Sequence, residues 1–406
     1  MEICPKNKCT GCFACVNACP AKCIAMQEDS YGELHPVIDE AQCRQCGLCK
    51  KVCPNNVNLD YAYPSRCYAS WISDKAKRRI CASGGIGTVM AEYVIRELQG
   101  VVFGSRYDKE LCPVMTYTEK IEDLEHFKGS RYVQSIVGKD TYIQVKDFLV
   151  SGRAVLFIGT PCQVAGLKTF LRKEYVNLIT VDLICHGVCP TKYFQEEVMH
   201  ICKENGLEGI EDVRFRGNDG KNYCLSFWKD KRKDNSYRCI YNKRGMSQYY
   251  FAGFLLGISM RENCYSCNYA CPDRISDITI GDFIGLGSEK PFPYPKGNVS
   301  SVTTNTERGF KFYQQMSETT PSLTNVERNY SERLVYKPSL VHPFERHPLN
   351  EKFKRLYLEV GYVKAIRKTL RGIVWKNKVK TVLNYWTYIY RIPRKIGKII
   401  LQKDKI

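Results

Sequence analysis

The sequence predicts a chain of three parts, in which a small cysteine-rich module precedes a body of mixed α/β and α+β class and a basic helical tail follows. Three observations lead to this prediction. A doubled cysteine motif fills the first 54 residues, strand and helix patterns then alternate, and positive charge is concentrated after residue 350. With 406 residues, the chain is long enough for such a module and one or two domains with their own cores.

The N-terminal module is defined by two copies of the spacing C-x2-C-x2-C-x3-C-P. This spacing is typical of ferredoxins with two [4Fe-4S] clusters, in which three cysteines bind one cluster and the fourth binds the other. It predicts one cluster on Cys9, Cys12, Cys15 and Cys53 and a second on Cys43, Cys46, Cys49 and Cys19. A zinc knuckle or a disulfide scaffold is the competing interpretation, although zinc motifs usually lack a fourth cysteine before a proline.

Residues 1–60 are expected to form this ferredoxin-like module, and Tyr63-Pro64-Ser65 reads as a linker because proline disfavours a continued helix. Strand and helix patterns alternate after it, which predicts an α/β layer with partly parallel strands. The expected strands are 67–72, 101–104, 154–158 and 178–184, and the expected helices are 86–98, 140–149, 163–172 and 191–205. Shorter strand patterns over 213–241 and a last buried strand at 278–280 favour an α+β second half.

Positive charge is concentrated in the tail, residues 346–406. The formal charge of the chain is +19, and from residue 351 onward 16 Lys and Arg stand against three acidic residues. Residues 351–406 therefore carry +13, and the preceding 350 residues carry only +6. Since the body does not interleave basic and aromatic residues in a nucleic-acid-binding pattern, we expect no nucleic-acid partner.

The tail also contains an amphipathic helix pattern. Its apolar positions at helical spacing are Val363, Ile366, Leu370, Ile373 and Val374. A basic helix of this kind, with Trp375 and Trp386, is suited to lie on an anionic membrane surface, which predicts a peripheral membrane contact. The alternative is a helix that packs on its own domain or on a partner while its charges stay solvated.

Cysteine usage and the lack of a membrane-spanning pattern predict the compartment. No apolar run approaches the roughly 18 to 20 residues that cross a bilayer, and no charged segment followed by an apolar stretch begins the chain. Because iron–sulfur ligation needs reduced thiolates, the 22 cysteines favour a reducing compartment. We expect a cytoplasmic protein, with association at the inner membrane surface through the tail as a further option.

Four cysteines of the body stand where ligands are expected. Cys162 begins a helix after a strand, Cys185 follows an apolar strand, and Cys264 and Cys267 form a C-x2-C pair. A thiolate at a helix N-terminus is stabilised by the helix dipole, which suits metal ligation or nucleophilic attack. Taken alone, Cys162 is equally consistent with a redox thiol or an inert buried cysteine. The C-x2-C pair taken alone is consistent with zinc binding.

Ordered motifs in the body resemble the coenzyme F420 hydrogenase/dehydrogenase beta-subunit family. They are GTPCQVAGL at 159–167, DLICHGV at 182–188, FRGNDGK at 215–221, and RENCYSC with RISDITIGDF at 261–283. The resemblance covers about residues 1–345. It implies a flavin and iron–sulfur oxidoreductase, with family regions at 66–180 and 181–345.

The resemblance implies a third [4Fe-4S] cluster on Cys162, Cys185, Cys264 and Cys267. Cys271 is a rival ligand, and His186 is expected to be a solvent-facing or hydrogen-bonded loop histidine. Ten cysteines are expected to be small buried hydrophobic residues without a role. They are Cys4, Cys23, Cys67, Cys81, Cys112, Cys189, Cys202, Cys224, Cys239 and Cys271.

An FAD site is expected from two segments. Ser83, Gly84 and Gly85 precede a helix, where backbone amides can approach a pyrophosphate, although such a turn is as often only structural. The segment KGSRYVQS at 128–135 resembles the flavin-contacting segment of the family. We therefore expect FAD contacts from Gly129, Ser130 and Gln134, with a hydroxyl from Thr160.

These features predict an oxidoreductase in which FAD exchanges electrons between a two-electron donor, coenzyme F420-like or nicotinamide, and the clusters, which pass them to an outside acceptor. The family's FRDK appears here as Phe215-Arg216-Gly217-Asn218, so the donor can differ, and no acid or base catalyst is assigned. A redox partner protein or a small hydride donor is expected. The competing functions are a non-catalytic electron-transfer subunit and a ferredoxin-linked reductase of an organic substrate such as a glycan or pigment precursor.

Overall fold

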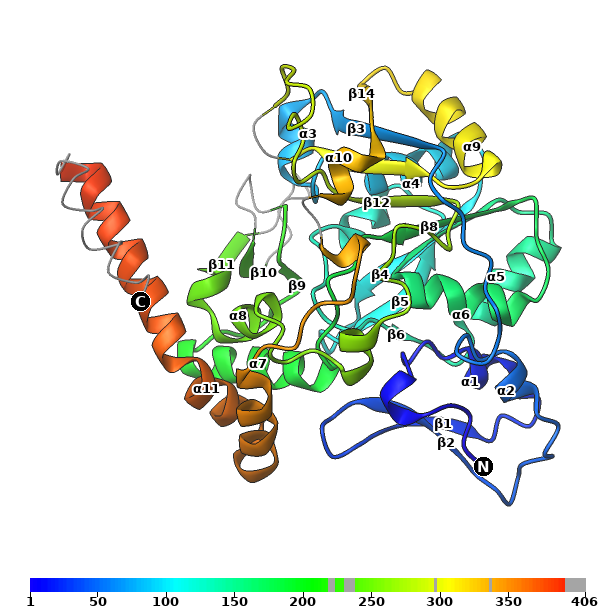
Figure 1. The fold of residues 1–406 in the computed structure, drawn as a ribbon, viewed down its shortest axis with the longest axis horizontal. Helices are drawn as coiled ribbons and strands as arrows, with labels where there is room; N and C mark the ends of the chain where they lie inside the picture. Colours follow the sequence, from blue (N-terminus) through cyan, green and yellow to red (C-terminus); the bar gives the residue numbers. More distant parts are fainter. Residues whose placement is uncertain (218–222, 230–237, 296–297, 336–337, 391–406) are drawn as a thin grey trace.

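The computed structural model describes residues 1–217, 223–229, 238–295, 298–335 and 338–390, so Asn218 and the end of the tail lie outside the described residues. A cysteine-rich module lies against the side of a large mixed sheet that α5 (Thr141–Val150) and α6 (Pro161–Leu171) cover, and the described part of the chain ends in a long helix (Figure 1). This arrangement confirms the expected mixed α/β class.

The N-terminal module has little regular structure of its own. Its elements are η1 (Lys6–Lys8), α1 (Ala14–Ala18), β1 (Ile24–Glu28), β2 (Leu34–Ile38) and α2 (Leu48–Lys51). Strands β1 and β2 form an antiparallel hairpin, and α1 contacts α5 and α6 of the body. Buried cysteines contribute much of its small core.

The body is built on one sheet of nine strands in the order β14-β3-β13-β12-β8-β7-β4-β5-β6. The strands are β3 (Arg66–Ile72), β4 (Val101–Tyr107), β5 (Pro113–Thr118), β6 (Ile136–Val137), β7 (Val155–Gly159), β8 (Leu178–Leu183), β12 (Ile278–Asp282), β13 (Ser300–Thr304) and β14 (Leu323–Arg328). The four central strands β12, β8, β7 and β4 are parallel. Their carboxyl ends therefore meet at one edge of the sheet, where α/β proteins place their ligands.

Helices cover both faces of this sheet. One face packs on α4 (Ile86–Arg96) and α9 (Glu307–Glu318), and the other packs on α5 (Thr141–Val150) and α6 (Pro161–Leu171). The alternation of β4 explains the two cores, because Val101 and Phe103 point to the α5 and α6 side while Val102 points to the α4 side. Both faces of the parallel strands are thus buried, as such sheets require.

Two features of the sheet differ from the expectations. Strand β12 is not the last strand of the sheet along the chain, because β13 and β14 follow it. Strand β13 pairs antiparallel with β12 and β3, and β14 pairs antiparallel with β3. The sheet also takes strands from both sides of the boundary expected at residue 181, so that boundary does not separate two sheets. Short polar strands such as β13, with its Ser and Thr residues, lack the apolar runs on which the prediction relied.

The C-terminal helix packs against a second layer, which consists of a small sheet and two helices. Strands β9 (Asp212–Arg214), β10 (Cys224–Lys229) and β11 (Arg238–Arg244) form an antiparallel sheet beside α7 (Thr191–Asn205) and α8 (Tyr249–Leu255). The short elements α3 (Lys75–Arg79), η2 (Glu122–Phe127), η3 (Gly245–Ser247), η4 (Glu262–Ser266), α10 (Tyr330–Leu334) and η5 (Pro338–Leu340) complete the body.

Helix α11 (Leu349–Tyr390) bends at Gly361, whose φ of 74° is open to glycine at little cost. After the bend, Ile366, Leu370 and Val374 are fully buried in the core shared with α7 and α8. The alternative of packing on the chain's own domain is therefore the one observed for this apolar face. Among the described residues, none of the helices combines the length and apolar character needed to cross a bilayer.

Candidate functional site

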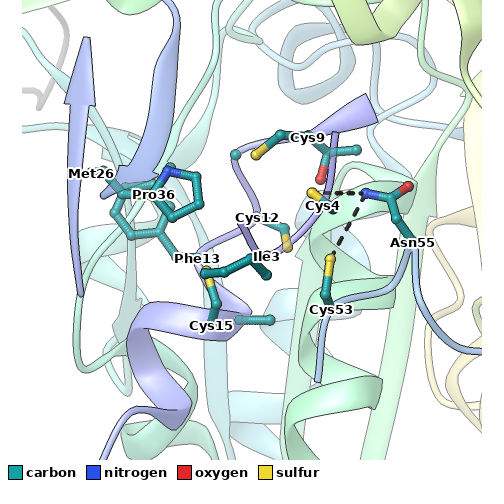
Figure 2. Close-up of a pocket in the computed structure, with 13 residues that line it drawn as sticks. Ile3, Cys4, Cys9, Cys12, Phe13, Cys15, Met26, Pro36, Cys53 and Asn55 are labelled. Carbon is teal, nitrogen blue, oxygen red and sulfur yellow. Dashed lines mark hydrogen bonds between the residues drawn. The ribbon is translucent and has the colours of Figure 1, made fainter. Parts of the chain in front are cut away.

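The first cavity of the module is lined by five cysteines. Cys9, Cys12, Cys15 and Cys53 surround a space of about 320 Å³, and Cys4 lines it as well. Figure 2 shows Cys53 beside Cys4, with the side-chain amide of Asn55 within reach of both sulfur atoms. The fourth cysteine of the second motif thus joins the first three of the first motif, which is the crossed arrangement expected from the spacing.

The second cavity repeats this arrangement. Cys19, Cys43, Cys46 and Cys49 line a space of about 340 Å³ together with Cys23. Cys4 and Cys23 were expected to be ordinary buried residues, but both lie on a cavity beside the expected ligands. Cys239 also departs from that expectation, because it is exposed on a strand at the edge of its sheet.

Two thiols of the first cavity, those of Cys12 and Cys15, resist ionisation because they are buried. Burial raises the pKa of Cys12 to about 12 and also raises that of Cys15. Thiolates at such depth need a positive charge nearby, which the iron of a cluster supplies. In the described part of the chain, no three His, Cys, Asp or Glu side chains come close enough to hold one metal ion. The thiols of each motif line the walls of a cavity.

A third cavity of about 540 Å³ lies at the carboxyl edge of the large sheet. Its thiols are Cys162, Cys185, Cys264 and Cys267. Cys162 stands at the first turn of α6 directly after β7, and Cys185 follows β8. The adjacent parallel strands β7 and β8 bring these two residues together, and η4 adds the C-x2-C pair. Burial raises the pKa of Cys162 to about 12 and that of Cys264 well above its usual range.

The rival ligand lies outside this cavity, whereas the neighbouring histidine lines it. The Cys271 thiol points to backbone, with its Sγ 3.1 Å from the carbonyl oxygen of Asp273, and Cys271 is not part of the cavity wall. His186 lines the cavity, where its ring packs between Phe254 and Phe344 at centroid distances of 4.9 and 4.2 Å. The half-buried His186 ring is therefore packed between two aromatic side chains.

The third cavity and the first cavity are neighbours. Thr10 lines both of them, and Gly166 on α6 lies against Cys12. Cys162 and Gly166 are four residues apart, so they share one face of α6, about 6 Å apart along its axis. A side-chain carbon at Gly166 would be 3.0 Å from the Cys12 Cβ and 3.1 Å from its Sγ. The absence of a side chain at Gly166 therefore allows the two cavities to approach.

Arg261 fixes the module to the body. It is fully buried, and its guanidinium donates to the carbonyl oxygens of Cys9 at 3.1 Å and Leu34 at 3.2 Å and to Oε1 of Gln134 at 2.9 Å. The buried carboxylate of Glu33 lies 3.9 Å from the same guanidinium. Sequence reasoning missed Arg261, whose only signal was its place inside the motif RENCYSC. Gln134, expected at the flavin, lies in this interface, where its amide also approaches the Gly11 carbonyl at 3.5 Å.

The other residues expected to contact FAD are spread along the sheet edge. At the N-terminus of α4, the Gly84 amide donates to Ser300 Oγ at 2.9 Å and the Gly85 amide to the Ala82 carbonyl at 3.1 Å. A Cβ on Gly84 would lie 2.2 Å from the Ser70 carbonyl oxygen, so this glycine is required by packing of the turn. The hydroxyl of Ser83 donates to the Val299 carbonyl at 3.0 Å.

The second expected segment makes a bend in which Gly129 and Ser130 both have positive φ, 97° and 57°. The carbonyl of Gly129 accepts hydrogen bonds from the amides of Phe215 and Arg216, so the bend is tied to the end of β9. Thr160 lies at the third cavity instead, with its hydroxyl 3.2 Å from the Cys162 sulfur. Its amide donates to Gln163 Oε1 at 2.9 Å, which begins α6.

A charged cluster completes the edge. Arg216 binds Asp282, the last residue of β12, through two hydrogen bonds of 2.7 and 2.9 Å, and the Tyr223 hydroxyl donates to the same carboxylate. Burial would raise the pKa of Asp282, but the bonds and charge of Arg216 outweigh burial and hold this pKa below its usual range. Arg216 thus pairs within the protein, directly before the two positions at which the sequence departs from the family motif.

Arg333 is an uncompensated cation near this cluster. It is fully buried, and none of its three guanidinium nitrogens has a hydrogen-bond partner in the described structure. Burial lowers the pKa of Arg333 to about 10, while the charge of Asp282 acts in the opposite direction. A buried guanidinium without acceptors is costly, so it marks a place where an anion would be stabilised. Nothing in the sequence around Arg333 indicated it.

Comparisons with known proteins agree with the two cysteine-rich regions. The family described as the C terminus of the coenzyme F420 hydrogenase/dehydrogenase beta subunit matches residues 152–326, which include all four thiols of the third cavity. A 4Fe-4S dicluster domain matches residues 8–57.

Similar proteins extend over limited lengths. The coenzyme F420-dependent sulfite reductase of Methanocaldococcus jannaschii is 22% identical over 238 residues, or 54% of this chain and 36% of the reductase. NADH-quinone oxidoreductase subunit I 2 of Geobacter metallireducens is 38% identical over 55 residues, or 12% of this chain and 41% of that subunit. The chain thus spans between a third and a half of the length of these relatives.

A solved structure is similar at lower identity. It is a chain from the F420-reducing [NiFe] hydrogenase complex of Methanosarcina barkeri, with a TM-score of 0.41 and 14% sequence identity. The match covers 78% of the present chain and 95% of that chain. At this level the likeness supports no structural argument.

Proposed function

Because the chain belongs to the coenzyme F420 hydrogenase/dehydrogenase beta-subunit family and carries a 4Fe-4S dicluster domain, we propose that it is an FAD-dependent iron–sulfur oxidoreductase with three [4Fe-4S] clusters. The first two clusters use the eight motif cysteines, and the third uses Cys162, Cys185, Cys264 and Cys267. The two-electron partner is a coenzyme F420-like or nicotinamide compound, and the one-electron partner is a protein.

The observation that carries this proposal is the line formed by the three thiol cavities. The third cavity shares Thr10 with the first, and the crossed cysteines Cys19 and Cys53 join the first to the second. At the far end, Cys46 and its neighbour Arg44 are exposed. Electrons therefore have a continuous route from the sheet edge to the surface, and an outside carrier exchanges them at the second cluster.

FAD is proposed at the carboxyl edge of the sheet, between the Ser83 turn and the bend at Gly129 and Ser130. When bound, FAD supplies the exchange between a two-electron donor and clusters that take one electron at a time. The amides of Gly84 and Gly85 are engaged within the protein, so the diphosphate is better matched by Arg333, whose guanidinium lacks an acceptor. The thiols of the third cavity border the same edge.

The variant R333M tests the place of the anion. Met keeps most of the apolar stem of the side chain and removes the buried charge, so flavin-free R333M should unfold at a higher temperature than the parent protein. The same variant should bind FAD at least about tenfold more weakly, which corresponds to about 1.4 kcal/mol. Thermal scans of flavin-free protein and fluorescence titration with FAD measure the two effects.

The control for R333M is R328M. Arg328 ends β14, five residues before Arg333 in α10, and its guanidinium is paired with a carboxylate. Its guanidinium binds the buried carboxylate of Glu332 at 2.7 Å. R328M should therefore lower the unfolding temperature and leave FAD affinity unchanged. Equal FAD affinity in R333M and the parent protein would contradict the proposed anion contact.

Iron and flavin content test the cofactor set. Protein prepared without oxygen should contain about twelve irons and one FAD per chain. The variant C162S should contain about eight, because the third cluster loses a ligand, whereas C271S should keep about twelve. In C162S, dithionite should still reduce the remaining clusters, but coenzyme F420, NADH or NADPH should not.

Two outcomes would reject the proposal. About eight irons without flavin in the parent protein would favour a non-catalytic electron-transfer subunit. Bound zinc in place of iron would exclude electron transfer at these sites altogether.

A further inference from the structure

Each cavity of the ferredoxin module is lined by five thiols, although a [4Fe-4S] cluster takes four protein ligands. The extra thiols are Cys4 in the first cavity and Cys23 in the second. We propose that Cys4 and Cys23 are reserve iron ligands, able to replace Cys53 and Cys19 respectively. This inference rests on the proposed assignment of the eight motif cysteines as cluster ligands.

The position of Cys4 supports exchange with Cys53. The side-chain amide of Asn55 lies 3.9 Å from the Cys4 sulfur and 4.0 Å from the Cys53 sulfur, so one donor serves both atoms. Figure 2 shows the two thiols on the same side of the cavity, both facing this amide. A modest turn of either side chain is therefore enough to exchange one sulfur for the other.

The backbone around Cys4 is held in place. The carbonyl of Ile3 accepts a hydrogen bond of 2.9 Å from the Asn56 side chain, and the buried side chain of Ile3 also lines the cavity. Asn55 donates a second bond of 3.0 Å to the carbonyl of Lys8. Cys4 therefore occupies a fixed position at the cavity although it lies near the chain end and outside the cysteine motif.

Cys23 has the same relation to the second cavity. Its sulfur lies 3.4 Å from that of Cys19, and its carbonyl accepts a bond of 2.8 Å from the Asp39 amide. Cys4 precedes the first motif and Cys23 follows it, so the internal repeat does not account for both. What they share is contact with the fourth cysteine of a motif, the one that crosses to the other cluster.

Other buried cysteines lack this arrangement. Cys67 belongs to an apolar cluster with Ala69, Trp71 and Phe283, and the Cys81 sulfur lies 3.6 Å from the hydroxyl of Thr88. These residues fit the interpretation of small hydrophobic side chains. Cys4 and Cys23 are the members of that group that line the cluster cavities.

The exchange needs no external reactant. The Cys4 thiol gives up its proton and forms a bond to iron, while the bond between iron and Cys53 breaks and the Cys53 thiolate takes up the proton. No electron is transferred, and the cluster keeps four thiolate ligands. The module would thus retain its cluster when a crossed ligand is lost or modified.

Paired variants of the full-length protein test the proposal. C53A should keep about twelve irons per chain and a four-iron electron paramagnetic resonance signal after reduction, with Cys4 as the new ligand. The double variant C4A/C53A should lose one to four irons or show a three-iron signal. C19A and C19A/C23A should behave in the same way at the second cluster.

The control C15A removes a ligand from the same cavity wall on the side away from Asn55, so Cys4 should not rescue it. C67A should leave iron content unchanged. Equal iron content and equal spectra in C53A and C4A/C53A would overturn the proposal for Cys4, as would failure of both C53A and C19A to retain their clusters. If the parent protein itself holds fewer than about eight irons, the ligand assignment fails instead.

Discussion

Replacing Arg261 by methionine should detach the ferredoxin module from the body. In R261M the carbonyls of Cys9 and Leu34 lose their donor, and the buried carboxylate of Glu33 loses the guanidinium that lies 3.9 Å from it. Breaking a buried ion pair by removing one partner costs roughly 3–5 kcal/mol. We expect an earlier urea midpoint, faster hydrogen exchange at residues 9–12, and slower reduction of the module's clusters by the two-electron donor.

Two further variants make this result specific. R66M removes an arginine whose pair with Glu327 is exposed, and it should change stability by no more than about 1 kcal/mol. E33Q in the R261M background should recover part of the loss, because the uncompensated carboxylate is then gone. Wild-type rates and hydrogen exchange in R261M would mean that the module is held by its apolar contacts alone.

The expected fold and the structure agree where the sequence has local, strongly periodic signals. The strands from residue 67 to 184 and the helices between them follow apolar patterns with turn residues at their ends, and the structure confirms these elements within a few residues. Strands β13 and β14 were missed because their residues are largely polar and gain burial from their neighbours in the sheet. Sheet order itself depends on contacts that no local pattern reports.

The residues of the candidate site also differ in whether a local sequence pattern predicts them. Cysteine spacing within the two motifs indicates which thiols line a common cavity, so the eight motif cysteines could be grouped in advance. Arg261 and Arg333 could not be identified, because their importance comes from burial and from partners more than 100 residues away, or from the lack of partners in the described structure. Cys4 and Cys23 were misjudged for a related reason, since nothing in their spacing indicates a fifth position on each cavity.

The variant G166V should disturb the contact between the first and third cavities. A side chain at this position meets the Tyr142 hydroxyl at 2.9 Å and the Cys12 Cβ at 3.0 Å, and α6 carries Cys162 one turn earlier. Overpacking of this kind typically costs about 1–3 kcal/mol. We expect iron loss from the first cluster, and slower electron transfer from the third cluster in the molecules that retain it.

The matched control is G372A, a glycine of α11 at which an added Cβ meets no atom within 4 Å. Alanine there should stabilise the helix by up to about 1 kcal/mol, with unchanged iron content and electron transfer. G166A should fall between G166V and the parent protein, because a single methyl group requires a smaller shift of Tyr142 and Cys12. If G166V transfers electrons at the parental rate with full iron content, the close approach along α6 is not part of the electron route, and the third cluster must reach the module through Thr10 and the η4 segment instead.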